Sequence, residues 1–186
     1  MKTKLLISTA MIAGTLAFVA APKEVLAETC LLDRDNDGIV DAGTDNDGSA
    51  NGEGNNSQLA CGVNADATGD FSTAIGATSE ASGSRATAIG NSSEATATNA
   101  LAIGVLADAT VSNTIAVGNE AQATEFGSIA VGFSADATLN GAVALGQAAQ
   151  SIGDGTIAIG DSAEAEMNGA VAIGDFADAV GDGAVA

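Results

Sequence analysis

The sequence contains no histidine, tryptophan or tyrosine, and it has only two cysteines and one proline among 186 residues. Histidine is the side chain that most often acts as a general acid or base near neutral pH, so its absence removes the commonest catalytic group. No glycine-rich phosphate loop joins a strand to a helix. The carboxylates are spread along the chain, without a pocket that would separate their pKa values. We therefore expect a protein that is not an enzyme.

Positive charge is also scarce, because five Lys and Arg residues stand against 24 Asp and Glu residues and give a formal net charge of −19. Such a chain would be repelled by the phosphates of nucleic acids and by anionic membrane surfaces, so we expect neither as a partner. The charge favours a cation or a basic patch on a partner. The simpler interpretation is that it keeps an extended, secreted fibre in solution.

Residues 1–27 have the pattern of a secretory signal peptide. Lys2 and Lys4 give the positive start, residues 5–21 are mostly apolar, and residues 25–27 offer small side chains for cleavage before Glu28. The apolar run is too short to argue for a retained transmembrane helix, and no later segment is long and apolar enough. We therefore expect an exported protein with no membrane span after signal cleavage.

Residues 28–64 form a second segment, which is acidic, rich in Asn and Gly, and contains both cysteines, Cys30 and Cys61. In an exported protein, two thiols that bracket a loop are most simply a disulfide. Closing a loop of about 30 residues would remove roughly 3 kcal/mol of unfolded-state entropy. This matters because the segment has few apolar residues around which to fold.

Alternating carboxylates within this loop are a pattern by which a chain wraps oxygen ligands around Ca²⁺. The run from residue 33 to residue 41 lacks the EF-hand glutamate, since the twelfth position is Thr44, and it resembles thrombospondin type 3 calcium repeats instead. The alternative is an acidic linker that binds no ion. The resemblance implies Ca²⁺ ligands at Asp33, Asp35, Asp37, Asp41 and the Ile39 carbonyl, with Asp45 and Asp47 serving a second, weaker site.

Residues 65–186 repeat every 14 residues without an insertion. The tripeptide Ala74-Ile75-Gly76 returns with Ile, Val or Leu at its centre, beginning at residues 88, 102, 116, 130, 144, 158 and 172. A fixed period of this kind predicts a solenoid, in which each repeat is one coil stacked on its neighbours.

Each coil is expected to contain two short strands and two turns. The segment Ile115-Ala116-Val117 alternates branched residues with alanine, which indicates a strand with a branched face and an alanine face. The glycine that follows permits a turn. The segment Ala107-Asp108-Ala109 alternates alanine with an acid and predicts the second strand. Stacked coils would then form two parallel ladders with about 4.8 Å between coils.

Three side-chain environments follow from this coil. The alanines face each other across a narrow interior, and the acids point to water because stacked like charges are costly when buried. The branched residues point outwards as a continuous apolar stripe, which on soluble proteins usually marks an interface. The coil's own core is thin at about 25 cal/mol per Å² of buried area, so we predict self-association around a symmetry axis. This predicted interface consists of Ile75, Ile89, Leu101, Ile103, Ile115, Val117, Ile129, Val131, Val143, Leu145, Ile157, Ile159, Val171 and Ile173.

The segments at residues 127–132 and 169–174 resemble the S-V-A-I-G strand in the head repeats of YadA-like trimeric autotransporter adhesins. The resemblance implies an all-β, left-handed parallel β-roll solenoid that assembles as a homotrimer. It also implies attachment to host extracellular matrix or cell-surface ligands. Such heads usually continue into a neck, a coiled-coil stalk and an outer-membrane anchor, which this sequence lacks. We therefore expect display on the bacterial surface if an anchor follows, and an extracellular protein otherwise.

Two other functions remain open at this point. A threonine column that includes Thr96 and Thr110 could order water in a secreted ice- or mineral-surface binder, although it breaks at Ile152 and Glu166. The roll could also be a passive structural spacer in a larger fibre. Candidate contact points near turns are Phe126, Phe133 and Phe176.

Overall fold

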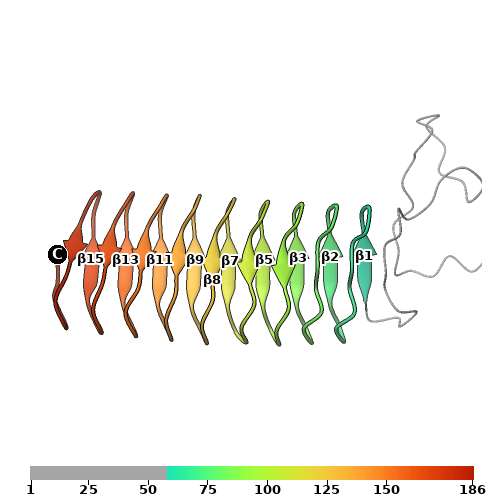
Figure 1. The fold of residues 1–186 in the computed structure, drawn as a ribbon, viewed down its shortest axis with the longest axis horizontal. Helices are drawn as coiled ribbons and strands as arrows, with labels where there is room; N and C mark the ends of the chain where they lie inside the picture. The colour runs from blue at the N-terminus through green and yellow to red at the C-terminus, as the bar shows by residue number, and fades with distance from the viewer. Residues whose placement is uncertain (1–57) are drawn as a thin grey trace, which may run out of the picture.

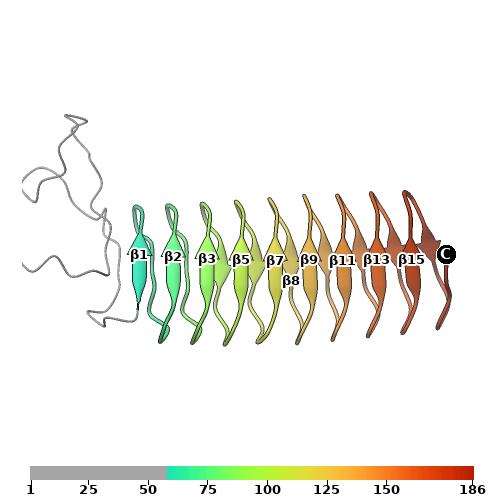
Figure 2. The same cartoon turned by 180° about the vertical axis from the view of Figure 1, so that it is seen from behind.

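The computed structural model describes residues 58–186, and these residues form a parallel β-solenoid that contains no helix (Figure 1). The coils stack in chain order, and the view from behind shows the same row (Figure 2). The fold confirms the all-β solenoid with 14-residue coils. The predicted signal peptide, the predicted calcium ligands and Cys30 lie outside the described residues.

The coils build two parallel ladders, because each strand pairs with the strand 14 residues further on; Ala102 pairs with Ala116, for example. The first sheet, in spatial order, consists of β1 (Leu59–Cys61), β2 (Thr73–Ile75), β3 (Thr87–Ile89), β5 (Leu101–Ile103), β7 (Ile115–Val117), β9 (Ile129–Val131), β11 (Val143–Leu145), β13 (Ile157–Ile159) and β15 (Val171–Ile173). The second sheet consists of β4 (Glu94–Ala95), β6 (Asp108–Ala109), β8 (Gln122–Ala123), β10 (Asp136–Ala137), β12 (Gln150–Ser151), β14 (Glu164–Ala165) and β16 (Asp178–Ala179).

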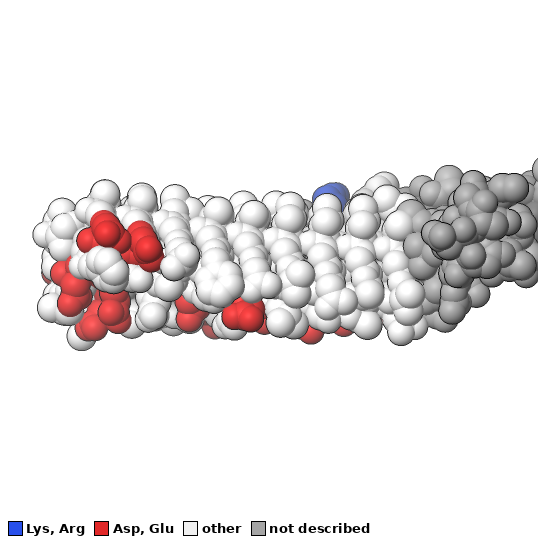
Figure 3. Space-filling view, turned by 90° about the horizontal axis from the view of Figure 1, so that it is seen from above, with Lys and Arg blue, Asp and Glu red and all other residues white. Residues whose placement is uncertain are grey.

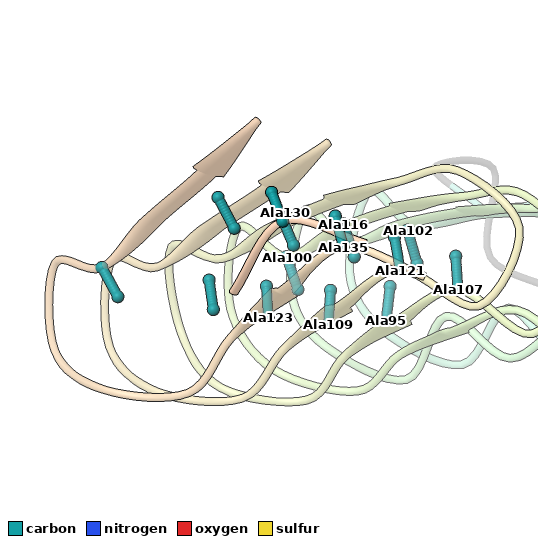
Figure 4. Close-up of a cluster of buried hydrophobic side chains, with 14 of the residues drawn as sticks. Ala95, Ala100, Ala102, Ala107, Ala109, Ala116, Ala121, Ala123, Ala130 and Ala135 are labelled. Carbon is teal, nitrogen blue, oxygen red and sulfur yellow. The ribbon is translucent and has the colours of Figure 1, made fainter. Parts of the chain in front are cut away.

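The interior between the two ladders is filled almost entirely by alanine. Ala102 and Ala116 of the first sheet and Ala109 and Ala123 of the second are all 0% exposed, and Figure 4 shows such alanines between the ladders. The largest fully buried side chains in the described part include no residue bigger than threonine. The prediction that only small groups line the interior is therefore confirmed for residues 65–186, and the larger Gln58 lies at the start of the first coil.

The turn after each first-sheet strand requires glycine for a steric reason. Gly118 has a φ of +143°, and a Cβ placed on it would lie 2.1 Å from the carbonyl oxygen of Gly132 in the next coil. The same close approach recurs at the equivalent glycines of most coils, so the backbones at this turn stack without room for a side chain.

Both turns also contain a residue in the left-handed region. Leu106 (φ 58°) and Glu120 (φ 57°) occupy this position in the first turn, and Asn113 (φ 63°) occupies it in the second. Hydrogen bonds between coils continue through the turns, since the Glu120 N–H donates to the Val105 carbonyl at 2.9 Å. The ladder therefore constrains the turns as well as the strands, and this explains why the period has no insertions.

The roll begins earlier than the sequence repeat predicted. The boundary was expected at residue 65, but β1 already pairs in register with β2, with Cys61 opposite Ile75. Cys61 thus occupies the outward position that Ile75 has in the next coil. Gln58 lies inside this first coil, is 5% exposed, and donates from Nε2 to the carbonyl oxygens of Thr68 (3.0 Å) and Gly69 (3.2 Å).

Candidate functional site

The branched residues predicted as an interface lie on one outer face of the first sheet, which we call the branched stripe. In β5, Ala102 is completely buried while Leu101 and Ile103 on either side of it are partly exposed. The same alternation recurs along the sheet, and Ile173 in β15 is 57% exposed. The side chains are half-buried because coils about 4.8 Å apart stack equivalent residues against each other. The structure thus brings all the predicted interface residues onto one continuous apolar surface.

A column of acidic residues runs along the outer side of the second sheet, as predicted. Asp108 pairs in register with Gln122, which pairs in turn with Asp136. The glutamine separates two carboxylates that would otherwise lie on adjacent strands, where like charges destabilise a sheet. Figure 3 shows acidic side chains along one long edge of the molecule and gathered at its C-terminal end. This face is therefore strongly negative.

A groove of about 450 Å³ lies where this acidic column meets the first turns. Burial raises the pKa of the Asp136 carboxyl, because removing water disfavours its charged form. One oxygen of Asp108 and one of Asp136, Oδ1 in each case, are inaccessible to solvent and accept no hydrogen bond. The larger side chains that line the groove are acidic, apolar or amide groups, and they belong to Glu94, Leu106, Asp108, Glu120, Gln122 and Asp136.

The acidic residues of the roll do not converge on a metal site. Within residues 58–186, no group of three or more His, Cys, Asp or Glu side chains is arranged to hold a metal ion. Strand stacking explains this, because a ladder sets equivalent carboxylates in a row about 4.8 Å apart and does not gather three of them around one point. The same part of the chain has no helix of the length and apolarity needed to cross a membrane.

Sequence reasoning found the columns but missed the groove. It named Phe126, Phe133 and Phe176, which do lie at turns and are 56%, 54% and 72% exposed. It did not single out Leu106 or Glu120, which share one position of the first turn in adjacent coils. The repeat could have identified them, because Leu106 and Glu120 occupy equivalent positions two residues before the acidic column.

One known protein family matches the described part of the chain. The YadA head domain repeat, a unit of two copies, matches overlapping segments at residues 59–79, 67–93, 81–107, 95–121, 109–135, 123–149, 140–163, 151–177 and 165–186. No curated protein matches the chain. The matches begin at β1 and follow the coils to the end of the sequence, in agreement with the fold. The chain therefore belongs to the family of proteins built from YadA head domain repeats.

Proposed function

We propose that this protein is the head of an exported, trimeric cell-surface adhesin that attaches to host matrix or cell-surface ligands. The observation that carries the proposal is the branched stripe on the outside of a roll made of YadA head repeats. An apolar surface that runs along an entire soluble roll needs a cover. Three copies around one axis would cover all three stripes and leave the acidic sheet facing outwards.

The segment before the roll belongs to this proposal. Cys61 ends β1 at the very start of the roll, so a disulfide to Cys30 would tie the preceding acidic loop to the first coil. Ca²⁺ bound by Asp33, Asp35 and their neighbours would offset the mutual repulsion of the loop's carboxylates. Calorimetric titration of the oxidised, exported chain with calcium tests this site, with Asp35→Asn and Asp37→Asn as the variant. A flat trace at millimolar calcium contradicts it.

Attachment is tested with beads coated with the chain that begins at residue 28. We expect these beads to bind immobilised extracellular matrix or host cells. The variant Ile103→Asp with Val117→Asp, which places charge in the branched stripe, should bind less because it loses the multivalency of a trimer. Asp178→Asn, in β16 of the opposite sheet and outside the groove, is the matched control and should bind normally.

The other functions give different results in the same experiment. A passive spacer would leave the beads no stickier than uncoated beads on every surface. An ice binder would show thermal hysteresis in solution while the beads fail to attach to matrix or cells. Either result would contradict the adhesive role while leaving the trimer itself to be tested separately.

A further inference from the structure

The groove on the acidic sheet combines two features that bear on what could occupy it. It extends over successive coils from Ser92 to Asp136, between the acidic column and the first turns. One feature is an exposed apolar side chain within the groove, and the other is a set of carboxylates with no basic side chain among the lining residues. Each feature limits the chemistry of what can occupy the groove.

The apolar feature is Leu106, which is 51% exposed although it lines the groove. Its φ of 58° is unfavourable for a residue with a Cβ, so the position would be better filled by glycine or asparagine on conformational grounds. The equivalent residue in the preceding coil is the small Ser92. Along the same row of turns, Val105 is 42% exposed and Phe133 is 54% exposed. An apolar partner would remove this surface from water.

The charged feature is a group of carboxylates that no basic side chain of the groove neutralises. Glu94, Asp108, Glu120 and Asp136 line the groove, and the one basic residue of the described part, Arg85, does not. The neutral donor that the structure gives Glu120 is the Ser134 hydroxyl at 3.3 Å. Glu94 and Glu120 are exposed, but the partial burial of Asp108 and Asp136 strengthens the field of these two carboxylates, because fewer water molecules screen them. Charge complementarity therefore requires a cationic occupant.

We infer that this groove is a docking site for a basic segment of a partner protein. An apolar side chain of that segment packs on Leu106, which lies in the same coil as Asp108, while lysine or arginine side chains of the same segment pair with Asp108 and Asp136. A single metal ion does not fit, because Gln122 stands between these two carboxylates and places them two coils apart, at about 10 Å. That separation suits two basic side chains of one segment.

The inference deepens the proposed function by naming the chemistry of the partner, and it rests on that function only for the biological setting. The groove is formed within one chain and lies on the sheet opposite the branched stripe. Peptide binding is therefore measured independently of attachment and of trimer formation.

The test is fluorescence anisotropy at low salt, with the chain from residue 28 onwards and a labelled peptide of alternating lysine and leucine. A lysine–serine peptide and spermidine are the comparison probes. The groove variants are Leu106→Ser, which copies the residue found at Ser92, and Asp108→Asn with Asp136→Asn. The matched control is Asp161→Asn with Asp175→Asn, which removes the same charge outside the groove. Circular dichroism confirms that each variant keeps its fold.

We expect saturable binding of the lysine–leucine peptide, about tenfold weaker binding by each groove variant, and unchanged binding by the control pair. Removing the apolar contact from either side should have the same effect. The affinity of the lysine–serine peptide for the wild-type protein should therefore be no higher than the affinity of the lysine–leucine peptide for the Leu106→Ser variant. If the two double aspartate variants, in the groove and outside it, lose the same peptide affinity, net charge alone explains the binding and the inference is overturned. Spermidine binding as tightly as the peptide, with no effect of Leu106→Ser, would overturn it as well. If peptide binding is lost in these variants but bead attachment persists, the groove stands and the adhesive ligand lies elsewhere.

Discussion

Gly118 packs directly against Gly132 of the next coil, so that a Cβ on Gly118 would lie 2.1 Å from the Gly132 carbonyl oxygen. Gly118 also has a φ of +143°, which L side chains rarely adopt. Two separate costs thus act on any substitution at this position, one steric and one conformational.

Gly118→Ala should lower the free energy of unfolding by about 3 kcal/mol or more, because the backbone of two coils must move apart. The matched control is Gly141→Ala at the second turn, where φ is +64° and no atom lies within 4 Å of the added Cβ. The control should cost only about 1 kcal/mol. Urea unfolding measures both values, and similar costs for the two variants would refute the close stacking of the first turns.

Ala130→Leu tests the narrow interior. Ala130 is 0% exposed between the two ladders, so a leucine there has no space and should destabilise the roll by about 3 kcal/mol. Ile129→Leu, at the adjacent outward position, keeps the side-chain volume and should cost less than about 1.5 kcal/mol. Thermal unfolding compares the two variants. The arrangement of inner and outer faces is wrong if Ile129→Leu proves the more damaging change.

Asp136→Asn should stabilise the protein at neutral pH. Burial raises the folded-state pKa of Asp136 above its unfolded value of about 3.9, so the ionised form carries a penalty in the fold. That penalty is complete above the folded pKa and disappears as the pH falls through it towards the unfolded value. The rise in melting temperature at pH 7 should therefore vanish by about pH 3.5. Glu94→Gln, an exposed acid of the same column, controls for net charge; an identical pH profile for both variants would contradict the burial effect.

Gln58→Ser tests how the first coil is closed. The Gln58 amide donates to the carbonyl oxygens of Thr68 and Gly69 from inside the coil, at a position where the next coil has Ser72. Serine is too short to reach these carbonyls, and the loss should cost about 1–3 kcal/mol locally. Hydrogen exchange at Asp66 and Ser72 should accelerate, while exchange in β9 stays unchanged. Unaltered hydrogen exchange in the first coil would show that the Gln58 side-chain amide does not stabilise this coil.

Much of this fold could be predicted from the sequence, because the 14-residue repeat predicts which residues pair in the parallel ladders. A parallel strand must match its neighbour residue by residue, so Ala102 recurring at Ala116 records the pairing itself. The alternation of Leu101, Ala102 and Ile103 then separates outside from inside, since only small residues such as alanine, serine and threonine are fully buried between the ladders.

Other features could not be predicted, because they depend on how turns are placed in space. The start of the roll was predicted at residue 65 because the acidic, Asn- and Gly-rich composition of residues 28–64 indicated a separate loop, although Ala60, Cys61 and Gly62 keep the phase of the repeat. The groove was missed because Leu106 resembles any turn residue until the backbone places it beside Asp108. The left-handed position of the first turn cannot be recognised from residue type, because serine, leucine and glutamate all occupy it in different coils.

Sedimentation equilibrium of the chain from residue 28 onwards tests most directly whether copies of the chain cover the branched stripe. We expect three times the monomer mass at micromolar concentration, and a monomer mass for the variant Ile103→Asp with Val117→Asp, which should retain its β-sheet circular dichroism. Wild-type protein that sediments as a monomer at these concentrations would contradict it.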